Sequence, residues 1–380
     1  MSKEQRDTIY LNHAGTSWPK PPTVLQACNR FQQSGPTDWP QIFNKAFQTV
    51  ADFYHIDRSR LLLTPSCTAA INLALTDHEW QAGDRILTSH FEHHALGRTL
   101  TKLNSLGVTT TKIQPGSDEL IDLAHLETEL KKSDVKLVAM TAACNVTGLL
   151  LPMVETIELA HQNNAMVLID GAQVAGWWDL DLRELGVDMF TIAGHKGPQA
   201  PWGIGGLYVA PRTQMHCASA VCELPTASES NTETPSQFEM PGYCDAGSVN
   251  IAALAGMAAG CEFLSSSENA TRLEKARDLT GRFTEQARQI ENVTIFHDVP
   301  LDKKMPSVAL GIDNMSSTDV AKQLRDAGII TSAGLQCSPD SHNALGTGKH
   351  GLTRFSFSSQ NAIDEVTTVL SRVQKIATNA

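Results

Sequence analysis

The chain has 380 residues, 41% of them hydrophobic and 19% charged, and a formal net charge of −11. That length suffices for a large core in one domain or two, while the acidic balance argues against a nucleic-acid partner. Since the chain lacks an apolar run of about 18 residues, a signal-like N-terminus and cysteines at metal-ligand spacing, we expect a cytoplasmic protein that spans no membrane and holds no metal.

The middle of the chain alternates between helical and strand patterns. In chain order, the predicted elements are a helix at 66–75, a strand at 85–88, a helix at 96–106, a strand at 109–113, a helix at 123–132, a strand at 135–141, a helix at 154–163 and strands at 166–169, 189–192 and 206–209. Such alternation over about 150 residues predicts an α/β domain with a largely parallel sheet.

The last third of the chain follows a different pattern. Residues 223–237 contain almost no apolar side chain and are predicted to form a long surface loop. After it come predicted helices at 250–264 and 268–290, a strand at 307–312, and helices at 317–326 and 362–376. This mixture predicts a smaller α+β domain at the C-terminus.

An acidic residue, Asp170, ends the predicted strand at 166–169, and Gln173 lies three residues further on. Parallel sheets bind ligands at the carboxyl ends of their strands. A carboxylate there can keep a pyridine nitrogen protonated, which makes the ring an electron sink. An Asp at this place also commonly caps a helix, so this motif alone leaves both interpretations open.

A lysine follows the predicted strand at 189–192, inside the turn Gly194-His195-Lys196-Gly197. A lysine that forms a Schiff base must be held rigidly and partly desolvated, which lowers its pKa. The common alternative is a solvated loop lysine. Asp170 at a neighbouring strand end and the glycine-rich turn at 203–206 favour the catalytic interpretation.

Two further motifs could serve a cofactor. Ser66-Cys67-Thr68 opens the predicted helix at 66–75, and the N–H groups and dipole of a helix start favour a phosphate, although an ordinary N-cap is also compatible. The histidine-rich segment at 89–95 could supply an imidazole that stacks on a flat ring or shuttles protons. A surface turn is the alternative there.

Taken in order, these segments resemble the class V aminotransferase family of fold-type I pyridoxal-phosphate (PLP) enzymes, and within it the cysteine desulfurases and selenocysteine lyases. The resemblance begins at 10–21, YLNHAGTSWPKP, which is similar to the family's YLDNAATS-PKP, and it ends at 351–358. It implies the PLP-dependent transferase fold of type I, with a mostly parallel seven-stranded sheet. The domains expected from it are an N-terminal arm at 1–16 that packs with the small domain, a large PLP-binding domain at 17–263 and a small C-terminal domain at 264–380.

The resemblance also implies which residues bind the cofactor, PLP. Lys196 would form the Schiff base, Asp170 would pair with the pyridine nitrogen, and Gln173 with the phenolic oxygen. His93 would stack on the ring and act in catalysis. The phosphate would be held by Cys67, Thr68 and His195, and by Ser248 of a neighbouring subunit, which implies a homodimer with shared active sites.

The remaining roles implied by the resemblance concern the substrate. Asn145 and Arg354 would bind the carboxylate of an amino acid, for which the fork of an arginine is suited. Cys337 lies in AGLQCSP at 333–339, similar to the family's GLHCAP, and Gln336 stands where that segment has a histidine. The family's cysteine attacks the sulfur of PLP-bound cysteine, becomes a persulfide and releases alanine. A small core cysteine is the alternative interpretation of Cys337.

We therefore expect a PLP-dependent sulfurtransferase of the cysteine desulfurase type, with Lys196, Cys337 and His93 as catalytic residues and a sulfur-acceptor protein as a partner. Selenocysteine lyase, cystine or cysteine C–S lyase and class V aminotransferase remain alternatives on the same scaffold. A nucleotide-binding oxidoreductase would need G-x-G-x-x-G after a first strand, which the chain lacks there. A scaffold protein without chemistry would have no need for Lys196, Asp170 and Arg354 together.

Overall fold

The structure is a computed structural model of the 380-residue chain, and it describes residues 8–116, 121–132, 134–213, 215 and 249–380. The predicted surface loop at 223–237 lies outside the described residues. Among the helices of the described part, none is both long and apolar enough to cross a membrane.

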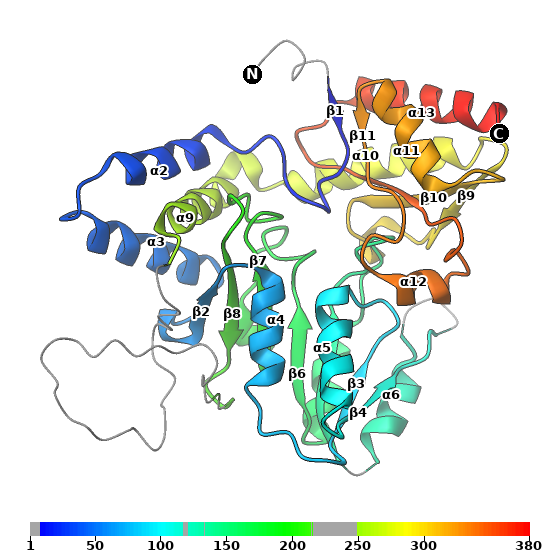
Figure 1. The fold of residues 1–380 in the computed structure, drawn as a ribbon. Coiled ribbons are helices and arrows are strands. Elements are labelled where there is room, and N and C mark those ends of the chain that lie inside the picture. Colours follow the sequence, from blue (N-terminus) through cyan, green and yellow to red (C-terminus); the bar gives the residue numbers. More distant parts are fainter. Residues whose placement is uncertain (1–7, 117–120, 133, 214, 216–248) are drawn as a thin grey trace, which may run out of the picture.

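A seven-stranded sheet forms the centre of the molecule, with the strand order β2-β8-β7-β6-β5-β3-β4 (Figure 1). Its strands are β2 (Leu61–Thr64), β3 (Arg85–Thr88), β4 (Thr109–Lys112), β5 (Val135–Thr141), β6 (Met166–Asp170), β7 (Met189–Ala193) and β8 (Gly205–Val209). Only β8 pairs antiparallel, with β7 and β2, while the other pairs of this sheet are parallel. The mostly parallel seven-stranded sheet is therefore confirmed.

Helices cover both faces of this sheet, because its strands are apolar on both sides. Successive residues of β6 show the alternation, since Leu168 belongs to one core cluster and Ile169 to the other. The helices joined to these strands are α4 (Cys67–Thr76), α5 (His94–Asn104), α6 (Leu123–Leu130), α7 (Met153–Gln162) and α8 (Leu182–Leu185). Figure 1 shows α4 and α5 side by side on one face.

Two long helices near the N-terminus have no counterpart among the predicted elements. They are α2 (Pro22–Gln33) and α3 (Trp39–Phe53), and both pack against α9 (Ile251–Ser265). Each carries a proline in its first two positions, where the missing N–H has no intrahelical partner to lose. That signal, together with the apolar spacing of Phe47, Val50 and Ala51, was available in the sequence.

The C-terminal part contains a three-stranded antiparallel sheet with the order β12-β10-β9. Its elements are α10 (Arg272–Ala287), β9 (Val293–Phe296), β10 (Ser307–Ile312), α11 (Ser317–Asp326), β11 (Ile329–Ile330), α12 (Pro339–Ala344), β12 (Thr353–Ser356) and α13 (Ile363–Thr378). The predicted helix at 268–290 was too long, because a separate 3₁₀ turn at Ser267–Asn269 precedes α10.

The N-terminal strand β1 (Ile9–Tyr10) pairs in parallel with β11, and Leu11 packs in the core of the C-terminal sheet. Figure 1 shows this first segment beside the elements of the C-terminal part. We propose that these contacts define an arm of the small domain. A boundary after residue 263 would fall in the last turn of α9, which runs to Ser265, so the division into domains stays a proposal.

Candidate active site

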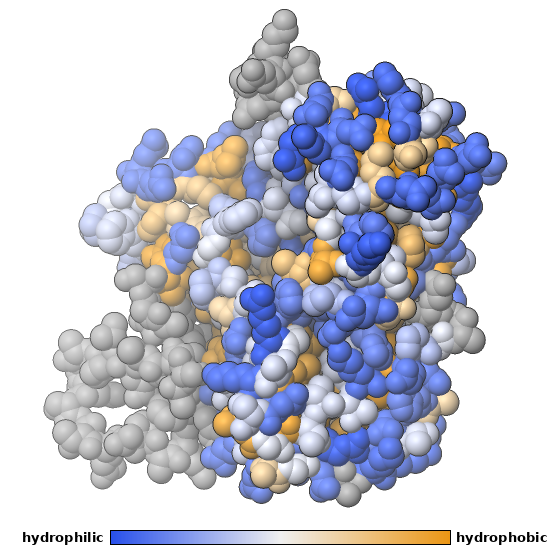
Figure 2. Space-filling model, turned by 45° about the vertical axis from the view of Figure 1, so that its right-hand side comes forward, coloured by the Kyte–Doolittle hydropathy of each residue, from blue (hydrophilic) through white to orange (hydrophobic). Residues whose placement is uncertain are grey.

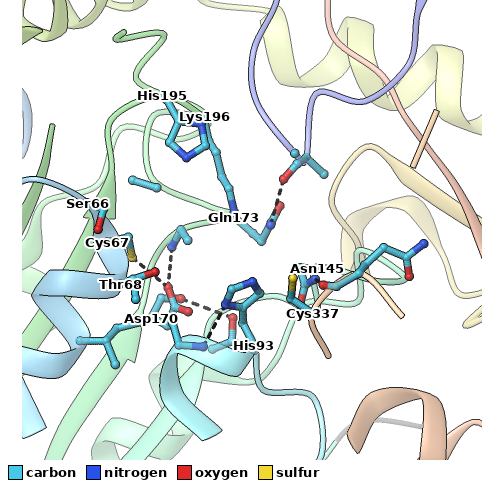
Figure 3. A pocket seen from close by; sticks show the side chains of 18 of the residues that line it. Ser66, Cys67, Thr68, His93, Asn145, Asp170, Gln173, His195, Lys196 and Cys337 are labelled. Atoms are coloured by element: carbon cyan, nitrogen blue, oxygen red, sulfur yellow. Dashed lines mark hydrogen bonds between the residues drawn. The ribbon is translucent and has the colours of Figure 1, made fainter. Parts of the chain in front are cut away.

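A cavity of about 320 Å³ lies at the carboxyl ends of β6 and β7 (Figure 3). It brings together every site residue that the sequence predicted within the described part of the chain. These are Cys67, Thr68, His93, Asn145, Asp170, Gln173, His195, Lys196, Cys337 and Arg354. The remaining one, Ser248, lies outside the described residues.

Asp170, the last residue of β6, is 3% exposed and presents one free carboxylate oxygen. Its Oδ1 accepts from the backbone N–H of Ala172 at 3.0 Å and from Thr191 Oγ1 and Cys67 Sγ, each at 3.4 Å. Among the described residues, none donates to Oδ2. The carboxylate is thus held by one oxygen and can accept a cationic N–H with the other.

Cys67 is the first residue of α4, and its thiol lies against side chains of β6 and β7. The Sγ contacts Thr191 Oγ1 at 3.1 Å as well as Asp170, so the thiol has partners other than a phosphate. Burial, and secondly the charge of Asp170, raises the pKa of this thiol well above its usual value. The thiol therefore stays protonated, while the N–H groups of the first turn of α4 remain at the cavity.

Lys196 follows β7 in a turn whose backbone is closely packed. A Cβ on Gly197 would lie 1.8 Å from the carbonyl oxygen of Ala175, so only glycine permits this packing. Burial lowers the pKa of Lys196, and the charge of Asp170 opposes that shift. No described residue forms a hydrogen bond with its Nζ, and Figure 3 shows the side chain entering the cavity. The amine is therefore available to a ligand.

His93 is the N-cap of α5, and its Nδ1 accepts from the N–H of Ala95 at 3.1 Å. Burial, and secondly the charge of Lys196, lowers the pKa of His93 to about 4. At neutral pH the ring is therefore uncharged, and because Nδ1 accepts, its proton is held at Nε2. Gln173 donates from Nε2 to the carbonyl of Ala14 at 3.2 Å, which fixes its amide beside the cavity.

Arg354 on β12 is a buried cation without an acid partner. It donates to the carbonyl of Asn145 and, over 2.8 Å, to Oδ1 of Asn12, while its buried Nε has no partner. None of the described acidic residues forms a salt bridge with it. Burial lowers its pKa to about 10, so it stays charged at neutral pH. A buried guanidinium with unused donors fits a carboxylate ligand.

Cys337 is exposed and lies in the segment between β11 and α12. The interpretation as a core cysteine is therefore wrong. Its carbonyl accepts from the N–H of His94 at 2.7 Å, which attaches this segment to the first turn of α5. Figure 3 shows Cys337 and Cys67 on opposite sides of His93. The cavity thus holds one exposed cysteine, Cys337, and one half-buried cysteine, Cys67, whose thiol already contacts Asp170 and Thr191.

Two residues that hold side chains of the cavity in place were missed from the sequence, although they do not line it themselves. Thr191 lies opposite Asp170 in the register of β6 and β7, a relation that an alignment of the two strand ends could have suggested. Asn12 contacts Arg354 from 342 residues away, and nothing local in the sequence indicates such a contact.

The residues present fit PLP, a flat pyridine with a phosphate and an aldehyde. The unpaired Oδ2 of Asp170 suits the ring nitrogen, the free amine of Lys196 suits the aldehyde, and the first N–H groups of α4 suit the phosphate. Gly205 permits this last arrangement, because a Cβ there would lie 2.7 Å from the backbone of Ser66. The helix start can therefore approach the end of the sheet closely.

Comparison with known proteins agrees with this arrangement. Residues 9–369 match the family model of the class-V aminotransferases. A "probable cysteine desulfurase" of Pyrococcus abyssi is 27% identical, over 98% of this chain and 94% of the relative, and one of Vibrio cholerae is 28% identical, over 97% and 93%. The apo structure of a cysteine desulfurase from Thermococcus onnurineus NA1 has a TM-score of 0.85 and 26% identity, covering 99% of this chain and 96% of that one.

Proposed function

Because the chain belongs to the class-V aminotransferase family, we propose that it is a PLP-dependent cysteine desulfurase that converts L-cysteine to L-alanine and keeps the sulfur as a persulfide on Cys337. One observation carries the proposal. The exposed Cys337 lines the same cavity as the free amine of Lys196 and the guanidinium of Arg354, which forms no salt bridge with any described acidic residue. Relatives named as cysteine desulfurases support it.

Each of three side chains in the cavity has a separate role in the proposed reaction. Arg354 binds the substrate carboxylate with its unused donors, and this orients the amino acid. Lys196 holds PLP and moves the proton at the α-carbon, which its lowered pKa favours. Asp170 holds the ring nitrogen in its charged form through Oδ2. PLP, when bound, supplies an electron sink for the pair released at the α-carbon.

Cys337 completes the reaction as the sulfur acceptor. Its thiolate attacks the sulfur of the substrate, an S–S bond forms, and the C–S bond breaks with its electron pair left on carbon. That carbon takes up a proton, so the products are alanine and a persulfide on Cys337. Cys67 is unsuited to this role, because the raised pKa of its thiol keeps it protonated and its Sγ contacts Asp170 and Thr191.

A substitution at Cys337 tests the proposal. The Cys337→Ser variant should bind PLP and L-cysteine as the wild type does, but should form little alanine and carry no added sulfur. In the wild type, mass spectrometry should find one extra sulfur atom on the peptide that contains Cys337. Cys28→Ser, a half-buried cysteine of α2 outside the cavity, is the matched control. If Cys337→Ser releases sulfide and pyruvate at the wild-type rate, the protein is a C–S lyase.

We also propose that the protein is a homodimer and passes its sulfur to an acceptor protein in a reducing, cytoplasmic setting. The similarity of residues 246–250 to a turn that reaches a neighbour's phosphate supports the dimer. Large apolar side chains exposed on α2 and α3, Leu25 and Trp39, add support, and Figure 2 shows apolar surface gathered in that region. Light scattering that finds a fully active monomer would overturn the dimer.

A further inference from the structure

The backbone at Cys337 adopts an unusual conformation. Gln336 has a φ of 40° and Cys337 a φ of 60°, so two consecutive residues other than glycine lie in the left-handed region. Each such residue costs about 1 kcal/mol or more in conformational energy. Such strain persists only where surrounding contacts offset it. In this segment, most of those contacts are hydrogen bonds of Gln336.

The side chain of Gln336 forms two hydrogen bonds that join separate elements. Its Nε2 donates to the carbonyl of Leu352, just before β12, at 2.6 Å. Its Oε1 lies 3.0 Å from Nε2 of His342 on α12. Because the carbonyl of Leu352 can only accept, the amide orientation is determined, and His342 must donate from Nε2. The amide thus ties the segment of Cys337 to both β12 and α12.

His342 is held in turn by a third partner. Its side chain is fully buried, and its Nδ1 lies 2.7 Å from Oγ1 of Thr347. Burial lowers the pKa of His342, so the ring is neutral at neutral pH. With the proton on Nε2, Nδ1 accepts from the Thr347 hydroxyl. Each hydrogen bond in the network Thr347–His342–Gln336 therefore joins one donor to one acceptor. Such a network holds its members in one geometry.

The two strained residues are also held through their backbone carbonyls. Nδ2 of Asn145 donates to the carbonyl of Gln336 at 2.8 Å, and the N–H of His94 donates to that of Cys337 at 2.7 Å. Both donors belong to the part of the cavity formed by the seven-stranded sheet and its helices. The segment is thus fixed on one side by its carbonyls and on the other by the side chain of Gln336.

We propose that Gln336 and His342 form a positioning pair that holds Cys337 in the left-handed conformation and aims its thiol at the substrate. This rests on the proposed function of Cys337 as sulfur acceptor. Gln336 lines the cavity beside Cys337 and His342 does not, and neither side chain forms or breaks a covalent bond in the proposed reaction. Loss of the pair slows the transfer of sulfur. Binding of PLP and of L-cysteine stays unchanged, because the side chains of Gln336 and His342 form no hydrogen bond with Lys196, Asp170 or Arg354.

The test compares four variants with the wild type. Gln336→Met keeps the length of the side chain but removes both hydrogen bonds, His342→Leu removes the partner, and a double variant removes both. Gln323→Met, an exposed glutamine on α11, is the matched control. For each protein we would measure PLP occupancy, the absorbance change on addition of L-cysteine, the single-turnover rate of persulfide formation, and deuterium exchange in the peptide at 334–338.

The expected result separates positioning from folding. Gln336→Met and His342→Leu should each form the persulfide about tenfold more slowly and exchange faster at 334–338, with unchanged PLP occupancy and absorbance change. The double variant should be no slower than either single variant, because the two residues act as one unit. Gln323→Met should match the wild type.

Several results would contradict the proposed positioning role of Gln336 and His342. Wild-type persulfide rates and exchange in Gln336→Met would do so, as would additive effects in the double variant. A loss of PLP or of the absorbance change in both single variants would show that the residues serve folding in general. If the wild type forms no persulfide at all, the proposed function fails, whereas the exchange data still decide whether the pair holds the segment.

Discussion

The hydroxyl of Ser338 donates to Oδ1 of Asn145 over 2.6 Å, so the residue after Cys337 is attached to the loop that follows β5. Nδ2 of the same amide donates to the carbonyl of Gln336. Both polar atoms of Asn145 therefore serve the segment that carries Cys337. The role of Asn145 in binding the substrate carboxylate stays a prediction, and only the second hydrogen of its Nδ2 is left for it.

Ser338→Ala should lower the free energy of unfolding by about 1–3 kcal/mol, because it leaves the buried Oδ1 of Asn145 without a donor. Ser338 is fully buried, so water cannot readily replace the hydroxyl. Urea unfolding followed by circular dichroism measures the change. Ser105→Ala, at an exposed hydroxyl after α5, should change the free energy by less than about 0.5 kcal/mol. Equal effects in the two variants would contradict the prediction.

Lys196→Ala should abolish covalent attachment of PLP. The amine of Lys196 is free and lines the cavity, whereas Nζ of Lys20 is held by Ser17 and by the carbonyl of His195. Borohydride reduction followed by dialysis should fix the cofactor in the wild type and in Lys303→Ala, an exposed control. Cofactor fixed to another lysine of the Lys196→Ala variant would show that the assignment is wrong.

Arg354→Lys should raise KM for L-cysteine about 10- to 100-fold, because the ammonium loses the two-pronged bond to a carboxylate, which is worth about 1.5–3 kcal/mol. The substitution keeps the charge, so kcat should change much less. Steady-state kinetics separate the two constants. An amine lacking the carboxylate, cysteamine, provides the control, since its KM should be similar in both proteins. A selective fall in kcat would point to a different role for Arg354.

Glu92→Gln should flatten the dependence of stability on pH. Glu92 is 5% exposed, pairs with Ser89 Oγ and accepts from the N–H of Thr141 at 2.9 Å. Burial raises its pKa to about 8. The ordinary pKa is about 4.3, so between these values the folded protein binds more protons than the unfolded chain, and stability falls as the pH rises.

In the wild type, the free energy of unfolding should fall by roughly 2–4 kcal/mol between pH 5 and pH 8 as Glu92 loses its proton. This follows from about 1.4 kcal/mol for each unit of pKa shift. Glutamine resembles the protonated acid, so the variant should lose that part of the decline. Urea unfolding at several pH values measures it, and Glu155→Gln on the exposed start of α7 is the control. Parallel curves for Glu92→Gln and the wild type would refute the raised pKa.

Much of the scaffold could be predicted because its signals are local. The bounds of β3, β5, β10 and α11 agree with the predicted ranges, since a short apolar run in a strand and an amphipathic period in a helix are local signals. Asp170 and Lys196 were candidates for the same reason, because Asp170 ends one apolar strand and Lys196 lies in the turn after another. The helices α2 and α3 were missed although their prolines and apolar spacing are also local signals.

By itself, the sequence determined the alternation of strands and helices and the residues at their ends, because periodicity, turn residues and side-chain type act over a few neighbours. Only the tertiary structure decided the partners of those residues. Ser338 and Asn145 are 193 residues apart, and the Cys67 thiol meets Asp170 instead of standing free at a helix start. Such contacts depend on how the C-terminal part docks on the sheet and how α4 packs against β6 and β7, which is set by the whole core and by no local pattern.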